Sequence, residues 1–239
     1  MKYLDLTFPD PASNLACDEA LLELCEKNGE DGVLRVWEPD HYFVVAGYAN
    51  KIASEVNTAA CQAKGVPIFR RFSGGGAVLQ GPGCLNYCLA VNNERLGIPA
   101  DLNASHRFVL ERHLKFCAGH SWDAVQIQGI SDLALNGRKF SGNAQHRKRL
   151  CSLFHGTFLL SFDISLIETF LQKPSREPAY RNNRSHEDFL SNLRMTPQDV
   201  CRALKQTWAA KDTLEDIPLD RIQALLSERY SRQEWNFKY

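Results

Sequence analysis

The sequence predicts an α+β fold, with a mixed, mostly antiparallel central sheet flanked by helices. Strand patterns dominate up to residue 160, and helical patterns follow residue 163. Within the strand-rich part, Asn136-Gly137 is typical of a two-residue hairpin turn, which sends the chain back antiparallel. The chain has 239 residues, of which 44% are apolar and 23% charged, so it can bury a core. We expect residues 1–239 to form a single domain.

The first half of the chain alternates strands with helices. Residues 2–8 fit a short strand, and a helix capped by Ser13 or Asn14 follows and ends near Gly29. Residues 42–46 are apolar on both faces, which is typical of a central strand. The other segments expected here are strands over 34–37, 67–70 and 85–91, a short helix between Asn57 and Gly65, and a helix over 101–119.

The second half begins with strands and ends with helices. The strands are expected over 125–128, 133–135, 138–144 and 150–160. Two later segments have the form of a capping box, in which a hydroxyl residue starts a helix and an acid follows three residues later. They are Ser185-x-x-Asp188 and Thr196-Pro197-x-Asp199. Residues 218–229 fit a last helix.

Composition and motif searches exclude several classes. Lys plus Arg and Asp plus Glu each total 28, so the zero net charge argues against bulk attraction to nucleic acid or membranes. The N-terminus lacks a secretory signal, and no apolar run approaches the ~20 residues of a membrane span. We therefore expect a cytoplasmic protein whose eight cysteines are free thiols. The phosphate loop, the dinucleotide fingerprint, the H-E-x-x-H zinc motif and the serine-hydrolase elbow are absent from the sequence.

The basic residues are concentrated in two windows that contain no acid. Residues 56–93 hold Lys64, Arg70 and Arg71, and residues 133–162 hold five more basic residues, including Lys139. A near-neutral protein that focuses positive potential locally is typical of one that binds a nucleotide or another small anion. The alternative is that the Arg147-Lys148-Arg149 run is a solvated turn.

The first window contains a glycine loop. Arg70-Arg-Phe-Ser-Gly-Gly-Gly-Ala-Val78 follows an expected strand, and three successive glycines carry an entropic cost. Without Cβ atoms, their backbone N–H groups can approach a phosphate or carboxylate closely, and Arg71 can make a bidentate contact with phosphate. The alternative is a flexible connection between strands.

The second window contains a lysine on a hairpin strand. Strand alternation places Ser141 and Asn143 on the face of Lys139, and Phe140 and Gly142 on the other face. Small residues around a lysine leave room for a ligand. Taken alone, however, a solvated lysine on an edge strand is the simpler explanation.

These two segments together resemble the lipoate-protein ligase family, a branch of the biotin/lipoate A/B ligases. The family's Arg-Arg-x-Ser-Gly-Gly-Gly-x-Val loop corresponds to residues 70–78, and its Gly-Arg-Lys-x-Ser-Gly-x-Ala strand to residues 137–144. Further matches lie at 14–22, 34–37, 154–157 and 174–186, so the resemblance covers essentially the whole chain. It implies a catalytic domain like that of biotin ligases and class II synthetases, without a C-terminal accessory domain.

The resemblance also implies an ATP-dependent, adenylate-forming ligase that uses Mg²⁺. Lipoate and ATP would give lipoyl-AMP and pyrophosphate, and a specific lysine of a lipoyl acceptor protein, a lipoyl domain or an H-protein-like partner, would then attack the mixed anhydride. Because many family members carry a further small domain, we expect a chain that acts alone or with a separately encoded accessory subunit.

Site residues follow from the resemblance, residue by residue. Lys139 would be catalytic, between the lipoyl carboxylate and the α-phosphate, and Asp132 would bind Mg²⁺. The positions expected to bind ATP and the adenylate are Arg71, Ser73, Gly75, Gly76, Ala77, Val78, Leu79, Asp132 and Lys139. The positions expected to bind the lipoyl group are Trp37, Val45, Gly75, Lys139, Gly142 and His155, of which His155 equally fits a packing role.

The chain departs from the family after Leu79. Many members continue with His-Asp and then Gly-Asn, where this chain has Gln80-Gly-Pro-Gly-Cys-Leu-Asn86, so no contact beyond Leu79 is carried over. One alternative is an octanoyltransferase or lipoyl amidotransferase of the same fold, which would use a cysteine thioester and no ATP. Its nucleophile would precede the Gly-Arg-Lys strand, where residues 128–132 contain no cysteine. Another alternative is a catalytically inactive lipoyl-binding subunit.

Overall fold

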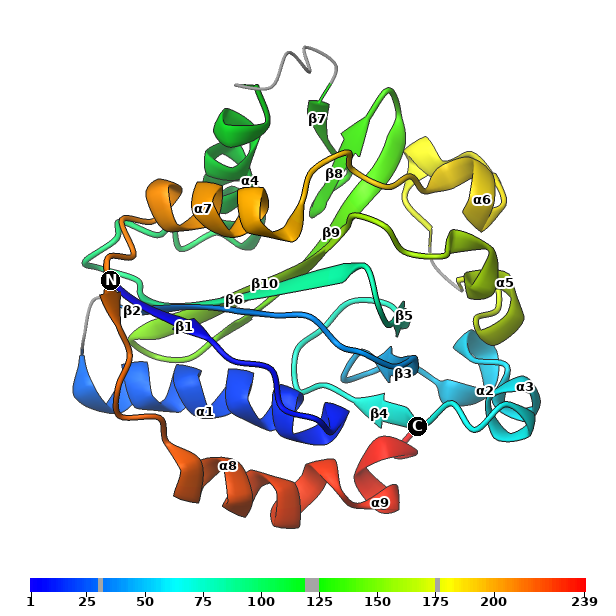
Figure 1. Ribbon diagram of the computed structural model, residues 1–239, viewed down its shortest axis with the longest axis horizontal. Coiled ribbons are helices and arrows are strands. Elements are labelled where there is room, and N and C mark those ends of the chain that lie inside the picture. Colours follow the sequence, from blue (N-terminus) through cyan, green and yellow to red (C-terminus); the bar gives the residue numbers. More distant parts are fainter. Residues whose placement is uncertain (30–31, 119–124, 175–176) are drawn as a thin grey trace.

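The computed structural model describes residues 1–29, 32–118, 125–174 and 177–239. Its main element is an eight-stranded sheet that crosses the middle of the molecule (Figure 1). In spatial order the strands are β11 (Asp212–Thr213), β1 (Lys2–Asp5), β2 (Gly32–Trp37), β6 (Cys84–Asn92), β10 (Cys151–Leu159), β9 (Arg138–Arg147), β8 (Asp132–Leu135) and β7 (Val125–Gln128). Strand β1 runs parallel to both its neighbours, and every other pair is antiparallel. The predicted mixed, mostly antiparallel sheet is confirmed.

A second, three-stranded sheet lies beside the first. Its order is β4 (Ile68–Arg70), β3 (Phe43–Ala46) and β5 (Val78–Gln80), with β3 parallel to β4 and antiparallel to β5. Strand β3 is therefore central in its sheet, as its apolar faces predicted. Strand β5 was not predicted, because it directly follows the glycine loop and is three residues long.

Helices cover both faces of the main sheet (Figure 1). One layer holds α1 (Pro11–Asn28), α8 (Leu219–Leu225) with a π-helical turn over Leu226–Tyr230, and α9 (Gln233–Asn236); the other holds α4 (Leu102–Ala118) and α7 (Pro197–Thr207). Short helices flank the small sheet: α2 (Ile52–Glu55), α3 (Thr58–Ala63), α5 (Ile167–Phe170) after a 3₁₀ turn over Ile164–Leu166, a 3₁₀ turn over Ala179–Arg181, and α6 (His186–Phe189). Apolar side chains fill the space between each layer and the sheet, which stabilises this arrangement.

Helix ends follow the predicted capping residues, with one correction. Asn57, Ser185 and Thr196 cap α3, α6 and α7 through their side-chain oxygens, and Gly29 ends α1 with a φ of 64°. The predicted cap of α1 at Ser13 or Asn14 is wrong. The side chain of Asp10 caps this helix instead, because Pro11 is the first helical residue.

Asn14 is used elsewhere, in a buried polar cluster. Its side chain accepts hydrogen bonds from the backbone N–H of Phe8 and from the guanidinium of Arg35, at 3.0 and 2.6 Å. Arg35 also donates to the carboxylate of Asp18 at 2.6 Å, and both side chains are buried. This cluster connects α1 to β2 and positions the neighbouring Trp37.

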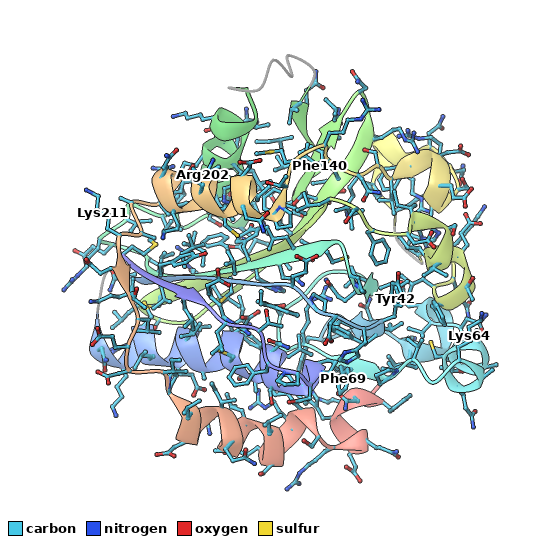
Figure 2. All side chains as sticks on the ribbon, viewed as in Figure 1. Tyr42, Lys64, Phe69, Phe140, Arg202 and Lys211 are labelled. Atoms are coloured by element: carbon cyan, nitrogen blue, oxygen red, sulfur yellow. The ribbon has the colours of Figure 1, made fainter. Side chains whose placement is uncertain are left out.

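The lysine hairpin contains a β-bulge that overturns the predicted alternation. The turn is as predicted, since Asn136 and Gly137 have φ values of 52° and 73°. In the ladder, however, Leu133 pairs with Ser141 and Ala134 pairs with Lys139, so Phe140 is the extra residue. A bulge shifts the parity of side chains along a strand. Lys139 therefore comes close to Gly142, which alternation had placed on the opposite face, while Phe140 packs in the core beneath α7 (Figure 2).

The remaining differences concern boundaries. The first strand ends at Asp5, the last helix changes to a π-helical turn after Leu225, and β9 extends to Arg147. The end of the predicted 101–119 helix at Gly119 lies outside the described residues. In the part of the chain that is described, no helix is long and apolar enough to cross a membrane.

Candidate functional site

A cavity of about 680 Å³ opens where the two sheets meet. Residues from both sheets, from α1 and from the segment between α5 and α6 line it. It contains every residue predicted to bind substrate except Ser73: Trp37, Val45, Arg71, Gly75, Gly76, Ala77, Val78, Leu79, Asp132, Lys139, Gly142 and His155. Its volume lies within the range of small-molecule and cofactor sites.

Arg71 organises the glycine loop from within. Its guanidinium donates to the carbonyl oxygens of Gly74 at 2.7 Å, Gly76 at 2.8 Å and Val45 at 3.3 Å. The sequence predicted a guanidinium free to bind phosphate, whereas here most of its donors are used by the loop itself. Burial lowers the pKa of Arg71 to about 10, so the guanidinium remains charged at neutral pH.

In the glycine loop, backbone carbonyls accept hydrogen bonds, whereas the backbone amides of the glycines have no partner in the described part of the chain. While the carbonyls of Gly74 and Gly76 accept from Arg71, the backbone N–H groups of residues 74–77 have no hydrogen-bond partner among the described residues. Gly74, Gly75 and Gly76 are exposed, so these donors are open to a ligand. Consecutive unpaired amides form an anion-binding nest, and an arginine that draws the carbonyls to one side favours this geometry.

Gly75 is required by the shape of the loop. Its φ of 93° is unfavourable for other residues, and a Cβ there would lie 2.7 Å from the Nη2 atom of Arg71. The loop also packs tightly on Gly47, where a Cβ would lie 2.1 Å from the carbonyl oxygen of Gly75. Gly74 and Gly76, in contrast, face open space.

Lys139, which lines the cavity, is paired with Asp132, and Asp132 in turn accepts a hydrogen bond from Tyr180. The Nζ atom of Lys139 is 2.8 Å from Oδ1 of Asp132, and the hydroxyl of Tyr180 donates to Oδ2 of the same carboxylate at 2.8 Å. Burial and the adjacent Asp132 raise the pKa of Tyr180, so the hydroxyl stays protonated. Lys139 is about one quarter exposed, and its amine reaches the space above Gly142 because no Cβ is present there.

Ser73 and His155 form the wall beside the loop. The Oγ atom of Ser73 and the Nε2 atom of His155 are 2.6 Å apart, and Ser73 is fully buried behind the lining. Burial, with repulsion from Arg71, lowers the pKa of His155 to about 3, so this imidazole is neutral at physiological pH. A neutral His155 keeps the wall uncharged and holds Ser73 in place.

The low pKa values of His155 and His113 predict a loss of stability in acid. Burial lowers the pKa of His113 to about 3 as well, and Trp208 donates to its Nε2 atom at 3.0 Å. The unfolded chain binds a proton at each imidazole near pH 6.5 and the folded chain does not, so the free energy of unfolding should fall with decreasing pH, by about 1.4 kcal/mol per pH unit for each histidine.

Urea unfolding between about pH 6.5 and pH 5 measures this dependence. In the His113→Gln variant, the slope of unfolding free energy against pH should be smaller by about 1.4 kcal/mol per pH unit, the contribution of one histidine. This holds whatever the stability of the variant at neutral pH. An unchanged slope would contradict a neutral, buried His113.

One end of the cavity is apolar. Leu15, Trp37 and Val45 are all buried there, and the guanidinium of Arg35 lies 5.3 Å from the ring of Trp37. Packed aromatic and aliphatic side chains suit an alkyl chain rather than a charged group.

Most of the basic residues in the two acid-free windows do not reach the cavity. Of the eight, only Arg71 and Lys139 line it. Arg70 binds carbonyl oxygens of Gly47, Tyr48 and Asn50, and its own carbonyl oxygen accepts from Trp235 of α9. It therefore joins the C-terminal helix to the base of the loop.

The 147–149 run is not simply a solvated turn either. Lys148 pairs with Glu23 of α1 at 3.2 Å, and Arg147 donates to the carbonyl oxygen of Ala100. Of the eight basic residues, the two that line the cavity are Arg71 and Lys139, whereas Arg70, Arg138, Arg147 and Lys148 make contacts within the fold.

Sequence reasoning missed several polar residues of the cavity. Beyond Leu79, Gln80 donates to Thr157 at 2.7 Å and accepts from Asn86 at 3.0 Å, so the divergent segment forms a closed network in the wall. The hydroxyl of Tyr180 reaches Asp132 from 48 residues away. No local pattern signals such contacts, since both depend on how distant segments pack.

The described cysteines lie apart from the cavity. No cysteine lines it among the described residues, and six of them are buried: Cys17, Cys25, Cys61, Cys84, Cys88 and Cys151. Burial raises the pKa of Cys17 to about 12 and that of Cys201 to about 11. The side chain of Cys117 is not among those described.

The capacity for Mg²⁺ centres on Asp132. Within the described ranges, no cluster of three or more His, Cys, Asp or Glu side chains could hold a metal ion. Mg²⁺ is commonly bound by one or two carboxylates together with substrate phosphates. Asp132 is one of four carboxylates in the described lining, the others being Asp18, Glu55 and Glu177, and it is the one paired with Lys139.

The cavity combines an apolar end, a lysine amine and a row of backbone amides that have no partner among the described residues. The family model described as the lipoyl protein ligase A/B catalytic domain matches residues 10–209. The chain therefore belongs to this family, and the resemblance stated from its motifs is confirmed.

Relatives with two different activities match the chain. A protein of Brevibacillus brevis called octanoyltransferase LipM is 24% identical over 272 residues, which cover 99% of this chain and 98% of the relative. A probable lipoate-protein ligase A of Mycoplasma pneumoniae is 27% identical, over 99% of this chain and 72% of the relative. A putative lipoate-protein ligase A of Aeropyrum pernix is 33% identical over 69% of this chain and 59% of its own length.

Solved structures share the fold. The bipartite lipoate protein ligase of Thermoplasma acidophilum, studied with its E2 lipoyl domain, superposes with a TM-score of 0.83 at 21% identity, covering 99% of this chain and 95% of that one. A lipoate-protein ligase A bound with ATP gives a TM-score of 0.78 at 23% identity, covering 99% and 98%.

Proposed function

We propose that the chain is an ATP-dependent lipoate-protein ligase, which activates lipoate as lipoyl-AMP and transfers the lipoyl group to a lysine of a lipoyl acceptor protein. One observation carries the proposal. Lys139 and the loop residues Gly75, Gly76 and Ala77, whose backbone amides have no partner among the described residues, line the same cavity, and its described lining contains no cysteine. This set of groups suits neutralisation of phosphates rather than nucleophilic attack by a thiolate.

In the first step, a carboxylate oxygen of lipoate attacks the α-phosphorus of ATP. The new P–O bond forms as the bond to the bridging oxygen breaks, and the electron pair leaves with pyrophosphate. Lys139 stands between the two anions and lowers their repulsion, while the loop amides hold the phosphate oxygens. The apolar slot formed by Leu15, Trp37 and Val45 holds the alkyl chain and keeps water from the anhydride.

Asp132 is the residue that would hold Mg²⁺, which when bound supplies charge neutralisation at the nucleotide phosphates. Both oxygens of Asp132 have partners here, Lys139 and Tyr180. An exchange of partners at this carboxylate would free the amine of Lys139 for the substrate.

In the second step, the neutral amine of an acceptor lysine attacks the acyl carbon of lipoyl-AMP. An amide bond forms, and AMP leaves with the electron pair of the C–O bond. The partner we propose is a lipoyl domain or an H-protein-like protein. The Thermoplasma acidophilum ligase, described together with an E2 lipoyl domain, supports that class of partner, as its bipartite nature supports an accessory subunit.

A second candidate is an octanoyltransferase that acts through a cysteine thioester, because relatives called LipM match 99% of the chain. That chemistry needs a thiolate beside the acyl group. Burial raises the pKa of Cys17, Cys84, Cys88 and Cys151, and none of these residues reaches the cavity. The ligase is therefore the better supported of the two.

Acylation of an acceptor domain separates the candidates. The intact chain is incubated with an acceptor domain and either free lipoate or octanoyl-carrier thioester, each with and without Mg-ATP, and the mass of the acceptor is measured. The ligase predicts a lipoyl mass gain from the free acid only when ATP is present. Acylation from the thioester alone would support the transferase instead.

Cysteine substitutions give an independent prediction. Changing Cys84, Cys88 or Cys151 singly to Ser should leave ligation within about threefold of the parent, because these thiols serve packing and lie outside the cavity. The readout is the initial rate of acceptor lipoylation, with circular dichroism to verify folding. A folded variant that loses activity would point to an acyl-enzyme.

A further inference from the structure

A second, smaller cavity of about 300 Å³ adjoins the first. The two cavities share four lining residues: Leu171, Gln172, Arg181 and His186. The smaller one is completed by Asn57, Glu168, Lys173 and Ser185. Because these four residues line both, the two cavities lie side by side.

Arg181 stands at the junction with an unused donor. Its side chain is 5% exposed, and its Nε atom donates to the carbonyl oxygen of Arg184 at 3.1 Å, with Glu177 at 3.5 Å. Its Nη2 atom is buried and has no hydrogen-bond partner in the described part of the chain. A buried guanidinium nitrogen without a partner is costly, so an acceptor supplied by a ligand would satisfy it.

The rest of the side cavity favours an anion. Lys173 is exposed, and no carboxylate of the described residues lies within ion-pair distance of its amine. Among the described residues of its lining, Glu168 is the one carboxylate, and it already accepts from the backbone N–H of His186 at 3.0 Å. Arg181 is paired with Glu177 but keeps one guanidinium nitrogen without a partner, and Lys173 has no counterion among the described residues.

We propose that the side cavity binds a phosphoryl anion, held by Arg181 and Lys173. The inference rests on the proposed function: in a ligase the anion is the pyrophosphoryl group of ATP, which leaves as the adenylate forms. A guanidinium matches phosphate oxygens in charge and geometry, and an exposed lysine adds charge. If the chain is instead a transferase, the same site takes the phosphate of a phosphopantetheine-bound acyl group.

The test compares the binding of inorganic pyrophosphate and of 4′-phosphopantetheine to the intact chain by titration calorimetry. Arg181→Gln removes the guanidinium, Arg181→Lys keeps the charge, and Lys173→Gln changes an exposed side chain whose loss leaves the fold intact. Lys211→Gln is the control, because Lys211 is exposed at the edge of the molecule away from the small sheet (Figure 2).

We expect affinity for pyrophosphate to fall about tenfold in Arg181→Gln and severalfold in Lys173→Gln, with Arg181→Lys intermediate and Lys211→Gln unchanged. In ATP–pyrophosphate exchange, the KM for pyrophosphate should rise while that for lipoate stays constant. If ATP–pyrophosphate exchange is absent but the Arg181 and Lys173 variants bind phosphopantetheine more weakly, the anion site is supported and the proposed ligase activity is contradicted. Unchanged affinity for both anions in folded Lys173→Gln and Arg181→Gln would overturn the inference.

Discussion

Replacing Lys139 with alanine should lower the rate of lipoyl-adenylate formation by about 10²- to 10³-fold. The lysine amine faces the main cavity and lies 2.8 Å from Asp132, so it can exchange that carboxylate for the anions of the substrates. Without it, two negatively charged groups must approach each other in a partly buried site. The measurement is lipoate-dependent exchange of labelled pyrophosphate into ATP.

The matched control is Lys211→Ala, which removes an exposed lysine far from the cavity. Its exchange rate should equal that of the parent. Because the Lys139 side chain is only partly buried, both variants should unfold at similar urea concentrations. Near-normal exchange by folded Lys139→Ala would remove Lys139 from the chemical step.

Replacing Gly75 with alanine should nearly abolish nucleotide binding. The φ of 93° strains an alanine by about 1–3 kcal/mol, and its Cβ would lie 2.7 Å from the Arg71 nitrogen that donates to the carbonyls of Gly74 and Gly76. Either the guanidinium or the loop must move, and both movements misalign the amides of residues 74–77. Binding of ATP by calorimetry measures the effect.

Gly74→Ala is the control for this substitution. A Cβ at Gly74 meets open space, and its backbone is not in the left-handed region, so the loop can keep its shape. ATP affinity should stay within a few fold of the parent. If both variants bind ATP equally well, the conformation held by Arg71 is not what binds the phosphates.

Local structure was predictable where a residue acts on its own neighbours. Asn57, Ser185 and Thr196 cap helices through the next three residues, and Asn136-Gly137 turns within a single hairpin. Such signals need no knowledge of the rest of the chain. The cap of α1 was mispredicted because Asp10, Ser13 and Asn14 are all good capping residues, and only the packing of Asn14 against Arg35 decides among them.

The sequence predicted which residues line the cavity better than it predicted the contacts that these residues make. The two motifs brought Arg71, Lys139 and their neighbours to one cavity. The bulge at Phe140, however, brings the side chain of Lys139 close to Gly142 on the same strand, whereas regular alternation would place the two residues on opposite faces. The donors of Arg71 are directed into the loop by its own folding, which no sequence pattern records.

The segment between α5 and α6 was the least predictable part. Tyr180 and Arg181 stand within a matched motif, yet their contacts with Asp132 and with the side cavity depend on the packing of that segment over β8 and β9. Long-range packing of polar residues leaves no periodic signal in the sequence.

In the ligase that we propose, this cavity activates a free carboxylic acid with ATP. Exchange of labelled pyrophosphate into ATP by the intact chain, measured with and without lipoate and without any acceptor protein, tests it most directly. We expect exchange that requires lipoate and is lost in Lys139→Ala. Absence of lipoate-dependent exchange, together with acylation of an acceptor from a carrier thioester, would contradict it.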